Sequence, residues 1–151
     1  MAIDNQNMDD ATQAYWQKYV DILQPLLRLR DWDVTVCRER PDNESHGASI
    51  GCFYGQKRAE LCIHMQHFNG LSDYDKKVTI AHELMHLHTA RTKDFVRTFC
   101  DTQSEETHGF FWSVYYEAFE EETETLAQII APFLPDPDVV VGPYPTSPVS
   151  Y

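Results

Sequence analysis

The sequence predicts an α+β fold, because two kinds of hydrophobic periodicity occur within one chain of 151 residues. Apolar residues recur every three to four positions in the long segments, which is typical of amphipathic helices. They alternate with polar residues in three short segments, which is typical of half-buried strands. The length suits one domain of ordinary size, and 42% hydrophobic residues are enough to bury a core.

The first half of the chain predicts one helix and a small sheet. Helical spacing runs over about 9–29, and a short alternating segment over 32–36 predicts a strand. Residues 48–54 and 59–65 alternate in the same way, and the turn-forming residues 55–58 between them predict a β-hairpin. We therefore expect a mainly antiparallel sheet of about three strands.

The second half of the chain predicts further helices. A capping box at Ser72 opens a helix that runs to about Thr89, and a shorter helical stretch follows near Phe95. After the polar segment 101–107, a long acidic helix is expected over 109–130. Its predicted inner positions are the apolar ones: Phe111, Val114, Tyr115, Ala118, Phe119, Leu126 and Ile129.

The ends of the chain differ in composition from its middle. We expect a flexible N-terminus over 1–8, a domain over 9–131 and a Pro-rich, poorly ordered tail over 132–151. No secretory signal is recognisable, and no apolar run approaches the ~20 residues that span a bilayer. These features predict a cytoplasmic protein. The four cysteines include no CxxC pair and are expected to be free thiols.

The charge of the chain is strongly negative and uneven. Lys and Arg number 12 against 24 Asp and Glu, giving a net charge of −12, which argues against nucleic acid and anionic membranes as partners. No Lys or Arg follows Arg97, whereas ten acidic residues do. Most of these acids are expected on a solvated surface.

One motif points to a specific chemistry: residues 82–86 read His-Glu-Leu-Met-His. Residues i and i+4 share a helix face, so His82 and His86 can bind one Zn²⁺ per chain through their ring nitrogens. Glu83 is the expected general base. His88 faces about 160° away from His86 on an ideal helix and is not expected in the same site.

A catalytic zinc ion needs a third protein ligand, and the residues leave several candidates. Glu120 on the acidic helix is preferred, because Glu124 lies one turn further on and can accept the remaining N–H of a ligating histidine. His108 is the second candidate and gives a three-histidine site. Glu121 and Glu117 remain further alternatives.

These motifs resemble a known family. The zinc motif, together with the acidic helix over 120–127 and the residues Ile129-Ile130-Ala131-Pro132 after it, resembles the small gluzincin-type HExxH metallopeptidases of phages and mobile elements. Those proteins are relatives of the ImmA/IrrE group and distant cousins of thermolysin. The segment 29–36 and the hairpin are also similar to short phage-encoded members. The resemblance implies a minimal zincin-like fold and, for a phage-encoded protein, a location in the host cytoplasm.

Carried onto this chain, the resemblance implies His82, His86 and Glu120 as zinc ligands and Glu83 as the base. Glu124 then lies behind the third ligand, although the family commonly has Asn or Asp at this position. A second resemblance concerns His108-Gly109-Phe110-Phe111-Trp112, which is similar to the SprT-like proteases, whose third ligand is a histidine. The usual DNA-binding function of that family fits an acidic chain poorly.

The sequence therefore predicts a zinc-dependent metallopeptidase, a hydrolase that acts on a protein or peptide substrate. Its edge strand, expected at 59–65, would hold an extended peptide, and His64, Tyr115 or Tyr116 would stabilise the oxyanion. Two alternatives are a non-catalytic zinc-binding regulatory domain and a metal-free interaction protein.

Overall fold

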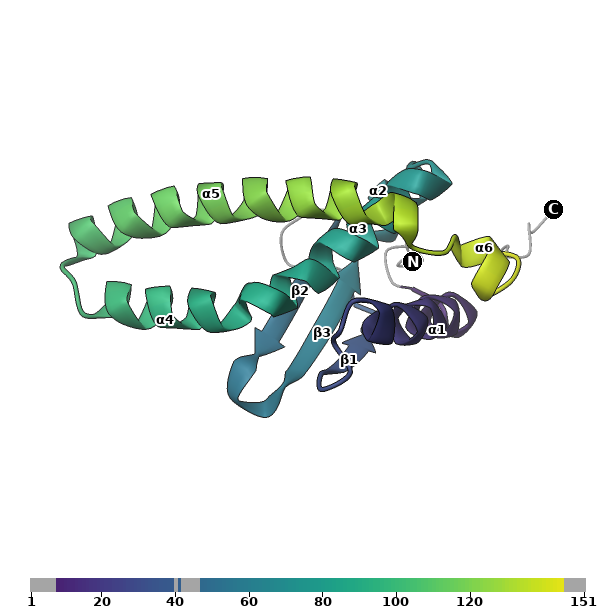
Figure 1. Ribbon diagram of the computed structural model, residues 1–151, viewed down its shortest axis with the longest axis horizontal. Helices are drawn as coiled ribbons and strands as arrows, with labels where there is room; N and C mark the ends of the chain where they lie inside the picture. The colour runs from purple at the N-terminus through teal and green to yellow at the C-terminus, as the bar shows by residue number, and fades with distance from the viewer. Residues whose placement is uncertain (1–7, 40, 42–46, 146–151) are drawn as a thin grey trace, which may run out of the picture.

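The computed structural model describes residues 8–39, 41 and 47–145 and is an α+β fold, as predicted (Figure 1). The expected flexible N-terminus, apart from residue 8, and the end of the tail lie outside the described residues. The strands are β1 (Asp33–Val36), β2 (Ala48–Phe53) and β3 (Arg58–Ile63). The α-helices are α1 (Asp10–Leu26), α2 (Met65–Asn69), α3 (Asp73–Met85), α4 (Ala90–Asp101), α5 (Glu105–Ile130) and α6 (Pro137–Val140). Single 3₁₀ turns are η1 (Tyr54–Gln56), η2 (His86–Thr89) and η3 (Ala131–Phe133).

The sheet has three strands in the order β1-β3-β2. β2 and β3 pair antiparallel with Phe53 opposite Arg58, so the predicted hairpin is confirmed. β1 pairs parallel with β3, so the sheet is mixed rather than mainly antiparallel. The central strand is therefore β3, and the prediction that 59–65 forms an edge strand is wrong. β2 is the edge strand on the hairpin side.

Only one face of the sheet is buried. Exposed and buried residues alternate along β1 and over most of β3, and the exposed set includes Asp33 and Thr35 on β1 and Glu60 on β3. Val36, Leu61 and Ile63 point to the opposite face, where they meet α1 and α3 in one core. α1 and α3 thus cover the same face, with α1 against β1 and α3 against β2. The large buried side chains of α1 include Trp16 and Tyr19.

Glutamine side chains of α1 close the outer edge of β1. Gln17 donates to the carbonyl of Val34 and accepts from the N–H of Val36, at 2.9 and 2.8 Å. Gln13 donates to the carbonyl of Val36, and Gln24 donates to that of Trp32. These bonds satisfy backbone groups that an edge strand otherwise presents to other chains. Among the described residues, the opposite edge strand β2 pairs with β3 alone.

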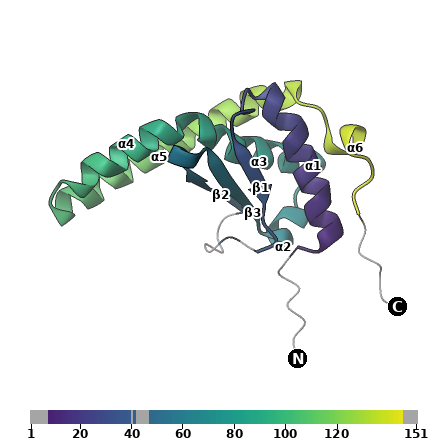
Figure 2. The ribbon, with the colours of Figure 1, turned by 90° about the horizontal axis from the view of Figure 1, so that it is seen from below.

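α4 and α5 form an antiparallel helical hairpin that projects beyond the sheet, as both views show (Figures 1 and 2). α4 follows α3 through the single turn η2, so the chain from 73 to 101 is almost continuously helical. α5 begins at Glu105 because Ser104 accepts the N–H of Thr107 as an N-cap. The polar segment expected at 101–107 is therefore mostly helical.

The inner face of α5 differs from the prediction. Its buried residues are Phe119, Thr123 and Ala127, and only the first of these belongs to the predicted inner set. Phe111, Val114, Leu126 and Ile129 are about half exposed or more. The apolar stripe thus faces outward, because the face toward α3 carries acidic and small side chains instead.

The Pro-rich segment packs on the domain as far as residue 145, in place of the expected extended tail. Leu134 is buried, and Lys77 of α3 donates to its carbonyl and to Asp136. Tyr19 donates to the carbonyl of Pro135 at 2.8 Å, and Tyr15 donates to that of Gly142 at 3.1 Å. The segment is therefore part of the folded domain.

Two findings on composition complete the fold. Across the described ranges, no helix combines the length and apolar character that crossing a bilayer requires. The four cysteines are free, as predicted, and Cys100 is fully buried.

The hydroxyl of Tyr19 provides a test of how the C-terminal segment is held. Tyr19→Phe removes one donor and leaves the carbonyl of Pro135 without its partner, so we expect a loss of about 1–3 kcal/mol in the free energy of unfolding. Urea denaturation of the two proteins measures it. Tyr74→Phe, at a tyrosine that is 47% exposed, is the control and should change stability little. Equal stability of the Tyr19 variant and the wild type would contradict the packing described.

Candidate metal centre

α3 presents the His-Glu-x-x-His motif to a cleft. The helix begins at Ser72, whose hydroxyl accepts the N–H of Asp75, and its buried face includes Ile80, Ala81 and Leu84. These core residues fix the rotation of the helix. His82 on α3 and His86 at the start of η2 therefore lie on the side that meets α5.

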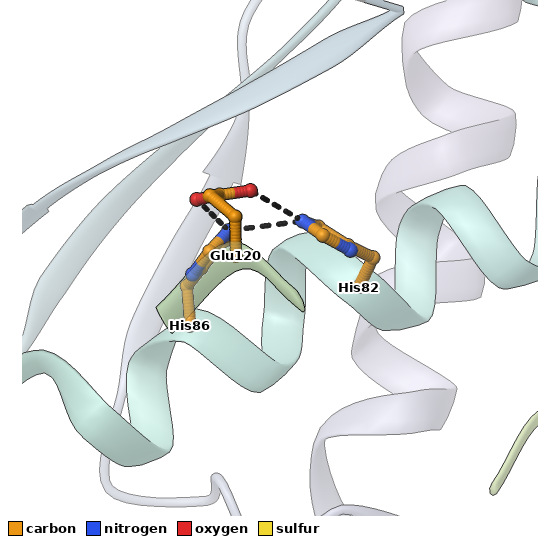
Figure 3. A group of neighbouring side chains, drawn as sticks. All are labelled: His82, His86 and Glu120. Carbon is orange, nitrogen blue, oxygen red and sulfur yellow. Dashed lines mark hydrogen bonds and ion pairs between the residues drawn. The ribbon is translucent and has the colours of Figure 1, made fainter. Parts of the chain in front are cut away.

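Three side chains converge at this point, two from the motif and one from α5 (Figure 3). His82 Nε2 lies 3.1 Å from His86 Nε2 and 3.2 Å from Glu120 Oε2. His86 Nε2 lies 3.2 Å from Glu120 Oε1. Glu120 is the preferred third ligand of the sequence analysis, and the fold brings it to the two histidines from 34 residues further along the chain.

The spacing of these atoms fits a small divalent cation. Ligands at about 2.0–2.1 Å from a tetrahedral zinc ion lie about 3.3 Å from one another. The observed separations of 3.1–3.2 Å match this edge length. Two imidazoles and one carboxylate are also a donor set that zinc prefers, and they leave a fourth position open.

Glu124 fixes the orientation of His82. Its Oε2 lies 2.7 Å from His82 Nδ1, and its Oε1 accepts from Gln128 at 2.9 Å. An N–H at Nδ1 that donates to this carboxylate leaves the lone pair of Nε2 facing Glu120 and His86. This carboxylate–histidine arrangement is typical of metal sites. Among the described residues His86 Nδ1 has no corresponding partner and is buried.

The protonation of the metal-free cluster follows from the same contacts. Burial lowers the pKa of His82, but hydrogen bonds to Glu120 and Glu124 and the charge of Glu83 outweigh burial and raise it. Burial lowers the pKa of His86 to about 4, so this ring is neutral. Burial raises the pKa of Glu120, and its contacts with the two histidines reverse this and lower it.

Glu83 lies against the same cleft and is only 7% exposed. Burial raises the pKa of its carboxyl to about 7, against opposition from the charges of His82 and Lys93. A carboxyl with a pKa near neutrality can both accept and release a proton, which suits a general base.

The cleft has a volume of about 520 Å³ and lies between β2, α3 and α5. One wall consists of Ala48, Ser49 and Ile50 of the edge strand β2, together with Gly47, which precedes the strand. The opposite walls carry the cluster. An extended chain in the cleft would therefore lie beside an open strand edge and the three converging side chains at once.

Several residues considered from the sequence lie elsewhere. His108 is bound to Asp101 at the far end of the hairpin, and twelve helical residues, about 18 Å, separate it from Glu120. The carboxylates of Glu117 and Glu121 are on exposed residues outside the cluster. His88 lies 2.6 Å from the carbonyl of Leu27, outside the cluster as expected. A three-histidine site with His108 is therefore incompatible with the fold.

The three residues considered for oxyanion stabilisation lie in different places. Tyr116 lines the cleft, and burial together with the charges of Glu120 and Glu83 raises its pKa. His64 instead accepts the N–H of His67 as the N-cap of α2, and Tyr115 stacks on Phe119. Only Tyr116 of these three therefore lines the cleft.

The cleft also contains residues that the sequence analysis did not single out. Lys93 of α4 lines it, and its ammonium lowers the pKa of Glu83, His86 and Glu120. His67 of α2 lines it from the other end. The one sequence signal for Lys93 is its position seven residues after His86, which is two helical turns.

Glu83 is expected to make the metal-free protein less stable as the pH rises from about 4.5 to 7. Its pKa is about 7 in the folded chain against an ordinary 4.5, so over this interval the folded state retains a proton that the unfolded state releases. The stabilisation of the folded state by the protonated Glu83 is therefore full below pH 4.5 and is lost as the pH rises to about 7.

Urea denaturation of wild type and Glu83→Gln in the presence of a chelator measures this effect. From pH 5 to pH 7, the wild type is expected to lose on the order of 2–3 kcal/mol in free energy of unfolding relative to Glu83→Gln. A difference independent of pH would show that Glu83 has an ordinary pKa.

Comparisons of the chain with protein-family models, with curated proteins and with solved structures give no match.

Proposed function

We propose that this chain is a zinc-dependent metallopeptidase in which His82, His86 and Glu120 hold the metal. The convergence of two imidazole nitrogens and a carboxylate at 3.1–3.2 Å, with a buried glutamate beside them, is the observation that carries the proposal. The open coordination position favours a catalytic rather than a structural site, since structural zinc sites are closed by four protein ligands.

Zinc, when bound, supplies a Lewis acid that activates water as a nucleophile and polarises the scissile carbonyl. Glu83 removes the proton of the attacking water and transfers it to the leaving amine. Glu124 holds the ring of His82 in the orientation and tautomer that ligation requires. Tyr116 lies in the cleft beside Glu120 and is the candidate donor for the developing oxyanion.

The substrate class follows from the edge strand. β2 borders the cleft at residues 48–50, and among the described residues it pairs with no strand besides β3. The backbone of Ile50 hydrogen-bonds to the carboxyl of Glu83, which places the proposed base directly at this edge. An extended peptide can add to such an edge through main-chain hydrogen bonds. The edge of β1 is occupied by glutamines of α1, so β2 is the edge available for a substrate. We therefore propose unfolded or extended polypeptide as the substrate.

Glu83→Gln separates metal binding from catalysis. The amide keeps the shape of the side chain but cannot accept the proton, so we expect an unchanged zinc content and a fall in peptide cleavage of at least about a hundredfold. Zinc content is measured by elemental analysis and cleavage with a diverse peptide library. Glu122→Gln, on an exposed glutamate of α5, is the matched control and should cleave normally. Normal cleavage by the Glu83 variant would refute the proposed mechanism.

Substitutions along α5 test the ligand set. The wild type should bind one zinc ion per chain. Glu120→Ala removes a ligand and should weaken zinc binding by more than about a hundredfold, which exceeds the loss expected when only a residue that orients a ligand is changed. Glu124→Gln removes the orienting carboxylate and should cost about 10–100-fold. Glu121→Ala, at the exposed neighbour, should leave affinity unchanged. Competition with a chromogenic chelator provides the measurement, and an equal loss in the Glu120 and Glu121 variants would contradict the assignment.

A further inference from the structure

The cleft beside His82, His86 and Glu120 continues along the edge strand β2. A second hollow of about 340 Å³ lies between β2 and α4, and it shares Ile50 and Lys93 with the first. Its walls are residues 50–54 on one side and the first two turns of α4 on the other. The two hollows together form a groove, which we call the β2–α4 groove, that leads away from the three converging side chains.

The charges along this groove change sign. The end beside the cluster is acidic, with Glu83, Glu120 and Glu124. The α4 end carries Lys93 and Arg97, which lie one turn apart on the same helix face, together with Asp94. Within the described ranges, neither basic side chain forms an ion pair with a carboxylate at 4 Å or less. Lys93 acts on Glu83 and Glu120 through its charge without a close ion pair, so both cations can still contact a ligand in the groove.

Lys93 and Arg97 are the last two basic residues of an acidic chain. The net charge is −12, and residues 98–151 carry no Lys or Arg. A net negative charge disfavours the approach of an acidic peptide, whereas two neighbouring cations beside the cluster attract its carboxylates locally. Charge complementarity at this groove therefore orients a ligand as well as binding it.

Helix geometry gives the distance between the cations and the cluster. Seven residues separate His86 from Lys93, an advance of roughly 10 Å along the helical chain, and Arg97 lies roughly 6 Å further. An extended peptide advances about 3.3 Å per residue. Carboxylates about three to five residues from the scissile bond would therefore lie opposite Lys93 and Arg97.

We propose that the β2–α4 groove selects peptide substrates that carry carboxylates on one side of the scissile bond, with Lys93 and Arg97 as the residues that bind them. The inference rests on the proposed peptidase function. The carboxylates are supplied either by Asp and Glu side chains or by the free C-terminus of the peptide. Both sources present the same group to the two cations.

The test starts from a peptide that the zinc-loaded wild type cleaves. Versions with Glu or Gln about three to five residues from the scissile bond, on either side, are compared by kcat/KM. We expect the Glu version to exceed the Gln version about five- to tenfold at low salt, and less at high salt. In Lys93→Gln/Arg97→Gln the ratio is expected to fall to about one, and in Lys93→Glu/Arg97→Glu a Lys version becomes the preferred one.

Arg91→Gln is the matched control, since Arg91 is exposed on α4 and lines neither hollow. It should keep the wild-type ratio. Amidation of the peptide C-terminus distinguishes the two carboxylate sources: the preference is lost on amidation if it depends on the terminus and persists if it depends on side chains. An unchanged ratio in the Lys93 and Arg97 double variant would overturn the inference.

Binding measured without cleavage separates this inference from the proposed function. The probe is a fluorescein-labelled peptide with four consecutive Glu residues, with its Gln counterpart as reference, and anisotropy is recorded on zinc-loaded Glu83→Gln. Preferential binding of the Glu peptide that disappears with Lys93→Gln/Arg97→Gln supports the groove, even where no peptide is cleaved and the peptidase proposal fails. Cleavage by the wild type with equal rates for Glu and Gln peptides supports the peptidase and refutes the groove.

Discussion

One electrostatic constraint organises the second half of this fold: His82 Nε2, His86 Nε2 and the Glu120 carboxylate meet within 3.2 Å of one another. Each is an electron-pair donor, so their convergence in a partly buried place costs free energy unless a proton or a cation lies among them. On the face of α5 toward α3, Glu120 and Glu124 supply the carboxylates that meet His82. Thr123 and Ala127 complete that face and allow the helices to approach.

The candidate site could be predicted in part, according to how local its determinants are. His82, Glu83 and His86 are related by helix geometry alone, so their spacing was sufficient. Glu120 could be preferred over its neighbours because Glu124, one turn later, offered a partner for a histidine N–H. The position of Lys93 two helical turns after His86 is a local signal, but its place beside β2 depends on how α4 continues α3, which that spacing alone does not encode.

The fold, like the candidate site, could be predicted only where it depends on residues close together in the sequence. Alternation located the three strands and their hairpin, since both depend on neighbouring residues, but it could not indicate that β1 pairs parallel with β3. The rotation of α5 was predicted wrongly, because the pattern assumes that the largest apolar side chains lie inside. Here the inner face contacts the polar cluster, so Leu126 and Ile129 are exposed. The proline-rich segment over 132–145 packs through tyrosine and lysine contacts from distant helices.

The glutamines of α1 have a consequence for how copies of this protein behave toward one another. Exposed strand edges allow sheets of separate molecules to join and aggregate. Gln13, Gln17 and Gln24 occupy the backbone groups along β1. Addition of a strand from a second molecule at β1 is consequently disfavoured, and within the part of the chain that the structure describes β2 is the edge left for it. Protection from self-association at one edge thus directs strand addition to the edge beside His82 and His86.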